Sequence, residues 1–297
     1  MRLEWIALAL VEGVGPALFR QLLARFGSPR EVLHAPIDAL IQVPRVSFEI
    51  ARQIHEMSKR LDQLQEELSQ LAERGVTILT WYDDAYPSNL KLITTSPPVL
   101  FVRGNVLERD AYAIAIVGSR QASFAGLKVA RDLAMAFAER GWTVVSGLAA
   151  GIDSAAHKGA LDAGGRTFAA LGSGILVPEN PQLAMRIERS GALLSELPPT
   201  AGVSVPNWLA RNRIVTGLAL GTIMVEGAER SGSVHAARNA LKQRRMLFIV
   251  HWNDDAEGHA GNRLMASRAT CTIPPDASIV DQLIAKLKGH YERMHLT

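Results

Sequence analysis

Short apolar runs alternate with segments of helical periodicity over the second half of the chain. Residues 113–117 and 246–250 are apolar at every position, whereas residues 125–140 place Leu133 and Phe137 on one helical face. Strands that are apolar on both faces are typical of a parallel sheet covered by helices. The pattern therefore predicts an α/β fold, a Rossmann-like and mainly parallel sheet with helices on both faces. The expected strands are residues 113–117, 143–146, 167–171, 192–195, 222–226 and 246–250, with 270–273 as a candidate seventh, and the expected helices include 125–140 and 234–244.

The first 75 residues have helical spacing instead, interrupted by turns. Apolar residues surround Gly13-Val14-Gly15-Pro16, a layout like a helix-hairpin-helix, in which glycines let a tight turn present amides that can grip a DNA phosphate. A second turn, Val43-Pro44-Arg45-Val46, lacks the glycines, and we expect it to be structural only. Helical spacing continues over residues 51–74 and is expected to stop at Gly75. We therefore predict a small all-helical domain, helix-hairpin-helix or SAM-like, over residues 1–75.

The stretch from residue 76 to residue 110 has neither pattern. Its prolines at positions 87, 97 and 98 disfavour a continuous helix. We expect an extended connector over residues 76–110 that packs on the core, followed by the Rossmann-like domain over residues 111–297.

Composition narrows the class of protein. The chain has 297 residues, of which 48% are hydrophobic and 21% charged, as expected for a globular protein of about two domains. Cys271 is the single cysteine, which fits a reducing compartment and argues against structural zinc. No apolar run approaches the ~18 residues of a membrane-spanning helix. Glu4 and Glu12 bracket the N-terminal apolar run, unlike a secretory signal. We expect a cytoplasmic protein without membrane contact.

The net charge of +3 is unevenly distributed. Residues 1–110 carry 12 basic and 14 acidic side chains, residues 111–250 carry 15 and 9, and residues 251–297 carry 5 and 6. Arginine supplies 25 of the 32 basic residues, and its guanidinium suits bidentate phosphate binding, although a GC-rich genome would produce the same bias. The positive charge therefore lies in the predicted α/β region.

The first strand of that region ends in a turn suited to an anion. Gly118, Ser119 and Arg120 follow it, and Ser123 precedes a helix, so backbone amides, a helix N-terminus and a guanidinium come together. The spacing is not GxGxxG, and no acid follows the second strand, which disfavours NAD. A P-loop is also missing. An ordinary turn between a strand and a helix remains the alternative.

The next two strands end in similar turns of small residues. Gly147 and Gly151 lie in the first of them, and Gly172 and Ser173 in the second. Three strand ends of one kind favour a shared binding edge, because the carboxyl ends of parallel strands lie together. Asp153 and His157 share a helical face beyond Gly151, and helix capping with a helix-to-helix hydrogen bond is favoured over catalysis for this pair.

Residues 208–233 add an aromatic side chain and more charge. Trp208 could stack a nucleic-acid base or fill the core under the loop. Arg211 and Arg213, on either side of Asn212, would point the same way only in an extended segment, because on a helix they lie ~200° apart. Ser231-Gly232-Ser233 offers another glycine and serine helix start.

The order and spacing of these motifs resemble the DprA/Smf family of DNA-processing proteins. The resemblance extends to Asp84-Ala85-Tyr86-Pro87 and the N-terminal hairpin, so it covers most of the chain. The stretches that carry it are Ile116-Val117-Gly118-Ser119-Arg120, Ser146-Gly147-Leu148-Ala149-Ala150-Gly151-Ile152-Asp153 with Ala156-His157, Leu171-Gly172-Ser173-Gly174, Ser195-Glu196, Arg211-Asn212-Arg213-Ile214 and Ser231-Gly232-Ser233.

The resemblance implies a protein that binds and protects single-stranded DNA and loads the RecA recombinase during natural transformation. It implies a homodimer that is not an enzyme and uses no cofactor or metal. By the same resemblance, Gly118 to Arg120 would hold phosphate, Arg211 and Arg213 would form a basic wall, and Trp208 stands where the family usually has Phe. The implied DNA-binding residues are Gly118, Ser119, Arg120, Ser123, Gly147, Gly151, Gly172, Ser173, Trp208, Arg211, Asn212, Arg213, Ser231, Gly232 and Ser233.

Some segments depart from the family pattern. The family's Tyr-Pro after Gly174 is replaced by Ile175-Leu176-Val177-Pro178. His251-Trp252-Asn253-Asp254-Asp255 replaces Pro-Gly and places two acids near the expected DNA path, where they would weaken binding. Only 24 residues follow Ile273, too few for the C-terminal winged helix of many members. We therefore expect a divergent member without that winged helix.

Two other hypotheses remain open. One is a nucleotide-binding or nucleotide-hydrolysing pocket like that of the Lonely-guy phosphoribohydrolases, whose fold is similar. Their Pro-Gly-Gly-x-Gly-Thr-x-x-Glu run is missing, so Glu226 or Glu229 would have to serve alone as the acid. The other is a scaffold that dimerises and recruits partners around a vestigial pocket.

Overall fold

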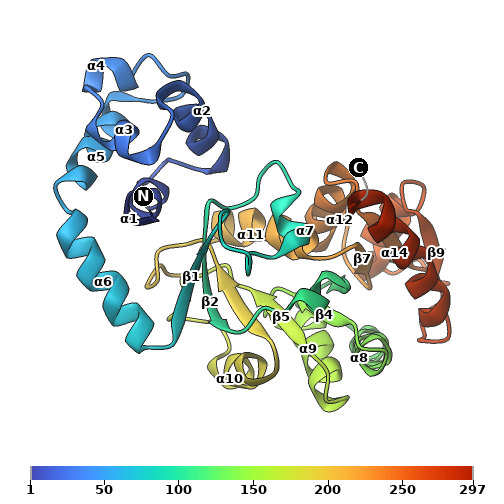
Figure 1. Ribbon diagram of the computed structural model, residues 1–297. Helices are drawn as coiled ribbons and strands as arrows, with labels where there is room; N and C mark the ends of the chain where they lie inside the picture. Colours follow the sequence, from blue (N-terminus) through green and yellow to red (C-terminus); the bar gives the residue numbers. More distant parts are fainter. Residues whose placement is uncertain (1, 296–297) are drawn as a thin grey trace.

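The computed structural model describes residues 2–295 and confirms the α/β class (Figure 1). Its sheet has the strand order β1-β2-β6-β5-β4-β3-β7-β8-β9. Strands β3 to β9 pair in parallel, whereas β2 pairs antiparallel with both β1 and β6. The strands are β1 (Val76–Thr80), β2 (Val99–Gly104), β3 (Ala113–Val117), β4 (Thr143–Ser146), β5 (Thr167–Ala170), β6 (Ala192–Ser195), β7 (Gly221–Met224), β8 (Met246–Val250) and β9 (Cys271–Ile273).

Helices cover both faces of the sheet, with α8, α9 and α10 on one side and α7, α11 and α12 on the other (Figure 1). None of the helices within residues 2–295 is long and apolar enough to cross a membrane. The helices are α1 (Arg2–Ala9), α2 (Pro16–Phe26), α3 (Pro29–His34), α4 (Ile37–Leu40), α5 (Phe48–Ser58), α6 (Leu61–Glu73), α7 (Ser88–Lys91), α8 (Phe124–Glu139), α9 (Ile152–Asp162), α10 (Pro181–Ser190), α11 (Val205–Leu218), α12 (Gly232–Lys242), α13 (Ala260–Ala266) and α14 (Val280–His295), with 3-10 helices η1 (Glu108–Ala111) and η2 (Glu257–His259).

Strand β3 shows why the central strands have no polar face. Its alternate residues pack into two different clusters: Ala115 lies with α11 and α12, and Ile116 lies with α8, α9 and α14. Each is 0% exposed. Both faces of the strand are therefore covered, as its continuous apolar run predicts.

Four of the strands have the bounds predicted from the sequence, namely β3, β4, β6 and β8. The candidate seventh strand is present as β9 at the sheet edge. The single helix expected over residues 51–74 is instead two helices, α5 and α6, separated at Lys59 and Arg60. Arg60 has φ −108° and ψ 11°, outside the helical region, and no Gly or Pro marks this break in the sequence.

The N-terminal helices contain two equivalent hairpin turns. Gly13 has φ +85° and is followed two residues later by Gly15, which precedes α2. Arg45 has φ +73° and is followed two residues later by Ser47, whose hydroxyl accepts from the Ile50 amide and caps α5. The second turn therefore repeats the backbone of the first, with an arginine in the left-handed conformation that glycine usually takes.

Residues 76–110, expected as an extended connector, supply strands β1 and β2 to the same sheet. Phe101 of β2 pairs with Ser195 of β6 and with Ile78 of β1. The side chain of Phe101 packs in one cluster with the N-terminal helices and α10. The connector therefore joins the helical region to the α/β core through both backbone pairing and burial.

Candidate nucleic-acid interface

The strand order places a topological switch point between β3 and β7. These strands are parallel neighbours, with Val117 paired to Met224, but the chain continues from β3 to β4 on one side and from β7 to β8 on the other. Open α/β sheets bind ligands in the crevice outside the carboxyl ends of such strands. Gly118 to Arg120 follow β3, and Glu226 lies two residues beyond β7.

A buried carboxylate fills this switch point. Glu226 is 4% exposed, and its oxygens accept from the Ser123 amide at 3.0 Å and from the Ser123 hydroxyl at 2.8 Å. Ser123 Oγ also accepts from the Gly126 amide and so caps α8. Helix N-termini attract anions, and here the protein's own carboxylate is the anion. In this structure, the amide and hydroxyl of Ser123 therefore bind Glu226.

Arg120 and Trp208 form the aromatic and cationic part of the site. The guanidinium carbon of Arg120 lies 3.4 Å from the centroid of the Trp208 ring. A Cβ atom at Gly172 would lie 2.4 Å from Trp208 Cδ1, so the absence of a side chain there lets the indole pack closely. The indole Nε1 donates to Glu179. Arg120 is exposed and Trp208 is half-buried, so the stacked pair faces solvent.

Arg211 is buried in a different environment. It is 4% exposed, its Nη1 donates to the Ala170 carbonyl at 3.0 Å, and it lies 3.9 Å from Asp153 Oδ2. Asp153 also accepts from the Gly147 amide at 3.1 Å. Burial raises the pKa of Asp153, opposed by the charge of Arg211. A Cβ at Gly147 would lie 1.3 Å from Arg211 Nη1, so the guanidinium fills the space beside this glycine.

Arg213 does not share a direction with Arg211, because both lie on helix α11. Its guanidinium is ion-paired with Glu196, the residue that follows β6. Between the two arginines, Asn212 donates from Nδ2 to the Gly232 carbonyl at 3.1 Å, which joins α11 to the start of α12. Residues 211–213 therefore join α11 to the ends of β5 and β6 and to the start of α12, and the two arginines do not point toward one ligand.

Other serines of the predicted site also make internal hydrogen bonds. Ser173 is 0% exposed, and its hydroxyl donates to the Val177 carbonyl at 2.9 Å. Ser231 caps α12 by accepting from the Val234 amide, and its hydroxyl lies 2.7 Å from that of Ser233. Gly232, at the start of α12, is exposed.

The turns after β3 and β4 lie against one another. The Ile152 amide donates to the Ser119 carbonyl at 3.1 Å, across the two turns. Gly151 has φ +77°, and a Cβ there would lie 2.2 Å from the Ser119 carbonyl oxygen. Only glycine fits at this close approach, and it brings Gly151 beside Ser119 and Arg120.

Glu226 and Glu179 contribute to the geometry although sequence reasoning did not place them at the DNA-binding site. Glu226 holds the start of α8, and Glu179 holds the indole of Trp208. Position alone could have indicated Glu226, because it follows an apolar strand at a predicted binding edge. Nothing in the local pattern connects Glu179 with Trp208, which lies 29 residues away.

The segment after β8 folds against the same switch point. Trp252 donates from Nε1 to the Val225 carbonyl at 2.7 Å, and its ring stacks on His259 at 4.7 Å. Asp254 lies 2.6 Å from His259 Nδ1, and this hydrogen bond lowers the pKa of Asp254. Asp255 is exposed. Both acids are thus exposed, and Asp254 is also bound to a protein partner.

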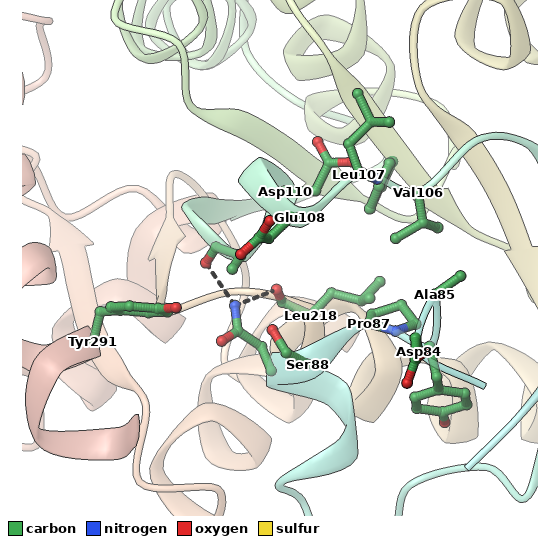
Figure 2. A pocket seen from close by; sticks show the side chains of 14 residues that line it. Asp84, Ala85, Pro87, Ser88, Val106, Leu107, Glu108, Asp110, Leu218 and Tyr291 are labelled. Carbon is green, nitrogen blue, oxygen red and sulfur yellow. Dashed lines mark hydrogen bonds between the residues drawn. The ribbon is translucent and has the colours of Figure 1, made fainter. Parts of the chain in front are cut away.

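A separate cavity of about 230 Å³ lies at the other end of the strands, near the amino ends of β3 and β7 (Figure 2). The Asp84 to Pro87 segment lines it, together with Glu108 of η1 and Tyr291 of α14. Asn89 Nδ2 donates to the carbonyls of Ala111 and Leu218 at its side. This cavity belongs to the attachment of the connector, not to the strand ends that carry the glycine turns.

Two known protein families match different parts of the chain. A sequence profile described as DNA recombination-mediator protein A matches residues 77–283. The chain belongs to the DNA recombination-mediator protein A family. A second profile, described as a SAM-like helix-hairpin-helix tandem, matches residues 6–60 and agrees with the two equivalent turns of the N-terminal helices.

Members of the DNA recombination-mediator protein A family are similar to this chain over different shares of its length. "Protein Smf" of Synechocystis is 33% identical over 95% of this chain and 72% of its own. "DNA processing protein DprA" of Bacillus subtilis is 38% identical over 60% of this chain, and the match spans 61% of that relative's length.

Solved structures of the family agree with the fold. The crystal structure of DprA from Streptococcus pneumoniae is 25% identical with a TM-score of 0.78, and the match covers 94% of this chain and 97% of that one. DNA processing protein A from Helicobacter pylori, described for its single-stranded DNA binding mode, shares the fold with a TM-score of 0.62 at 23% identity, over 73% of this chain and 97% of its own.

Proposed function

We propose that this protein binds and protects single-stranded DNA and loads the RecA recombinase onto it during natural transformation and recombination. Its membership of the DNA recombination-mediator protein A family supports the proposal, as does the single-stranded DNA binding described for the Helicobacter pylori relative. We also propose that it acts as a homodimer in the cytoplasm, without enzymatic activity.

The stacked pair of Arg120 and Trp208 carries this proposal. The guanidinium carbon lies over the indole, 3.4 Å from the ring centroid, and the backbone of Arg120 lies against Gly151. An oriented guanidinium can donate two hydrogen bonds to a phosphate, and its exposed plane can stack with an unpaired base. Duplex DNA hides its base faces, so the second contact favours single strands.

Glu226 argues against the nucleotide-hydrolysing alternative. Its carboxylate already accepts from the Ser123 amide and hydroxyl, where a nucleotide phosphate would otherwise meet the N-terminus of α8. A carboxylate held in this way is not free to attack or protonate a substrate. Glu229 is exposed on the same loop.

A binding titration tests the DNA-binding part of the proposal. Labelled oligothymidine and the same length of duplex are titrated with the protein and with Arg120→Ala over a salt series. We expect a preference for the single strand and a loss of at least tenfold in affinity for Arg120→Ala, with a shallower salt dependence. Arg189→Ala, at an exposed arginine in the last turn of α10, is the matched control.

The loading part needs a separate measurement. RecA filament formation on single strands already covered by single-strand-binding protein is followed with and without this protein. We expect the lag before filament growth to shorten, and Arg120→Ala to restore it. An unchanged lag alongside intact DNA binding would leave a single-strand binder and reject the loading role.

A further inference from the structure

An open groove continues from Arg120 along the outer surface of helices α8 and α9. It has a volume of about 770 Å³ and begins where Arg120 and Gly151 meet. Phe124, Leu127, Arg131 and Met135 line it at helical spacing from α8, and Ser154, Lys158 and Asp162 line it from α9. From Phe124 to Met135 the rise of the helix is about 16 Å. The groove is thus continuous with the site of the proposed function.

Phe124 is the most exposed large hydrophobic side chain in the described chain. It is 86% exposed and stands at the first position of α8, directly after the Ser123 cap. No core packing holds it there, and a helix start does not need an aromatic residue. An exposed ring beside an oriented guanidinium is instead the arrangement on which an unstacked base can lie.

Ion pairs neutralise most of the charged side chains that line the groove. Asp162 is paired with Arg131 at 2.9 Å and with Arg186 at 3.2 Å, and Lys128 lies 2.6 Å from Asp132. Lys158 is exposed and has no ion pair among residues 2–295. Lys158 and Arg120 are therefore the cations available to a ligand, and Phe124 lines the same groove.

We propose that single-stranded DNA leaving Arg120 and Trp208 continues along the α8/α9 groove, with a base stacked on Phe124 and a phosphate paired with Lys158. This inference rests on the proposed function and extends it to a second contact point. A second copy of the chain would cover Phe124 equally well, but burying Lys158 without a counter-charge would oppose such contact. A polyanion with exposed aromatic faces satisfies both side chains.

Length-dependent binding tests the path. Short and long oligothymidines are titrated with the full chain and with Phe124→Ala and Lys158→Ala. We expect both variants to bind the short oligomer like the parent, because Arg120 and Trp208 suffice for it. For the long oligomer we expect Phe124→Ala to weaken binding at least about fivefold. Lys158→Ala should reduce the slope of log affinity against log salt by about 0.7.

The neighbouring residues Lys91 and Leu92 provide the matched controls. Leu92 is 50% exposed at the end of α7 and Lys91 is exposed, and both lie on the helix layer across the sheet. Lys91→Ala and Leu92→Ala should leave both affinities unchanged. As a measurement that needs no variant, photo-crosslinking of 4-thiothymidine oligomers to the parent protein should label the peptide that contains Phe124.

Different failures point to different errors. Parent-like binding of the long oligomer by both groove variants, with Arg120→Ala still defective, overturns this path and leaves the proposed function standing. No binding of single strands by the parent rejects the proposed function itself. Light scattering that shows Phe124→Ala to lower the oligomeric state, with unchanged DNA binding per protomer, identifies the groove as a protein interface and also overturns the path.

Discussion

Residues of the same type, close together in the sequence, differ in their burial and in their partners. Arg211 and Arg213 are two positions apart on α11, yet one is enclosed by Asp153 and the Ala170 carbonyl and the other is paired with Glu196. Arg120, by contrast, is exposed and oriented by Trp208. An exposed guanidinium can exchange water for phosphate, whereas Arg211 would have to leave Asp153 as a buried unpaired charge.

His157 should make stability sensitive to acid. It is 0% exposed with Nδ1 at 2.7 Å from Thr167 Oγ1, and burial, followed by the charge of Arg211, lowers its pKa to about 3. Its unfolded pKa is about 6.5. The folded state thus binds fewer protons between these values, so the free energy of unfolding falls as the pH drops below 6.5. From pH 6.5 to 5 we expect this residue to account for a loss of about 1.5 kcal/mol.

Urea titrations over this range, compared with His157→Asn, check that expectation. Asparagine keeps a donor for Thr167 but does not titrate, so its curve should be flatter than that of the parent by about the stated amount. Parallel curves for the two proteins would show that His157 is not the source of the acid sensitivity.

At the scale of the element, the start of α8 depends on a residue from another strand end. The Ser123 hydroxyl caps the helix and donates to Glu226. Disturbing the hydrogen bonds of a buried charged acceptor costs more folding free energy than disturbing those of an exposed one. We expect Glu226→Gln to lower the free energy of unfolding by about 1–3 kcal/mol. Glu229→Gln, at an exposed position on the same loop, should change it by less than about 0.5 kcal/mol. Equal effects in thermal or urea unfolding would reject a special role for Glu226.

At the scale of the whole molecule, aromatic packing attaches the N-terminal helices to the sheet. Trp5 is 2% exposed, donates from Nε1 to the Pro98 carbonyl at 2.7 Å, and meets Phe19 and Trp81 edge to face. We expect Trp5→Ala to cost about 3–5 kcal/mol. Hydrogen exchange should show α1, α2 and β1 losing protection together, while β3 and β7 keep theirs. Phe48→Ala, at a ring 65% exposed in the same region, should leave exchange unchanged.

Local pattern predicted the central strands well because burial on both faces leaves a continuous apolar run. It failed between α5 and α6, where Lys59 and Arg60 interrupt the helix without a Gly or Pro. It also did not show that β1 and β2 join the sheet, since edge pairing with β6 depends on contacts far away in sequence. At the site, the positions of the glycine turns were predictable, but the groups that occupy the space beside them were not.

The sequence by itself determined the α/β class, the strand-end position of Gly118 to Arg120 and the resemblance that leads to the DNA recombination-mediator family. These features follow from periodicity and short motifs, which are properties of neighbouring residues. Only the tertiary structure decided that Arg120 lies on Trp208, that Arg211 is enclosed, and that Glu226 occupies the helix N-terminus. Each of those outcomes depends on which side chains from distant strands share one edge of the sheet, and desolvation there decides which charge stays available to a ligand.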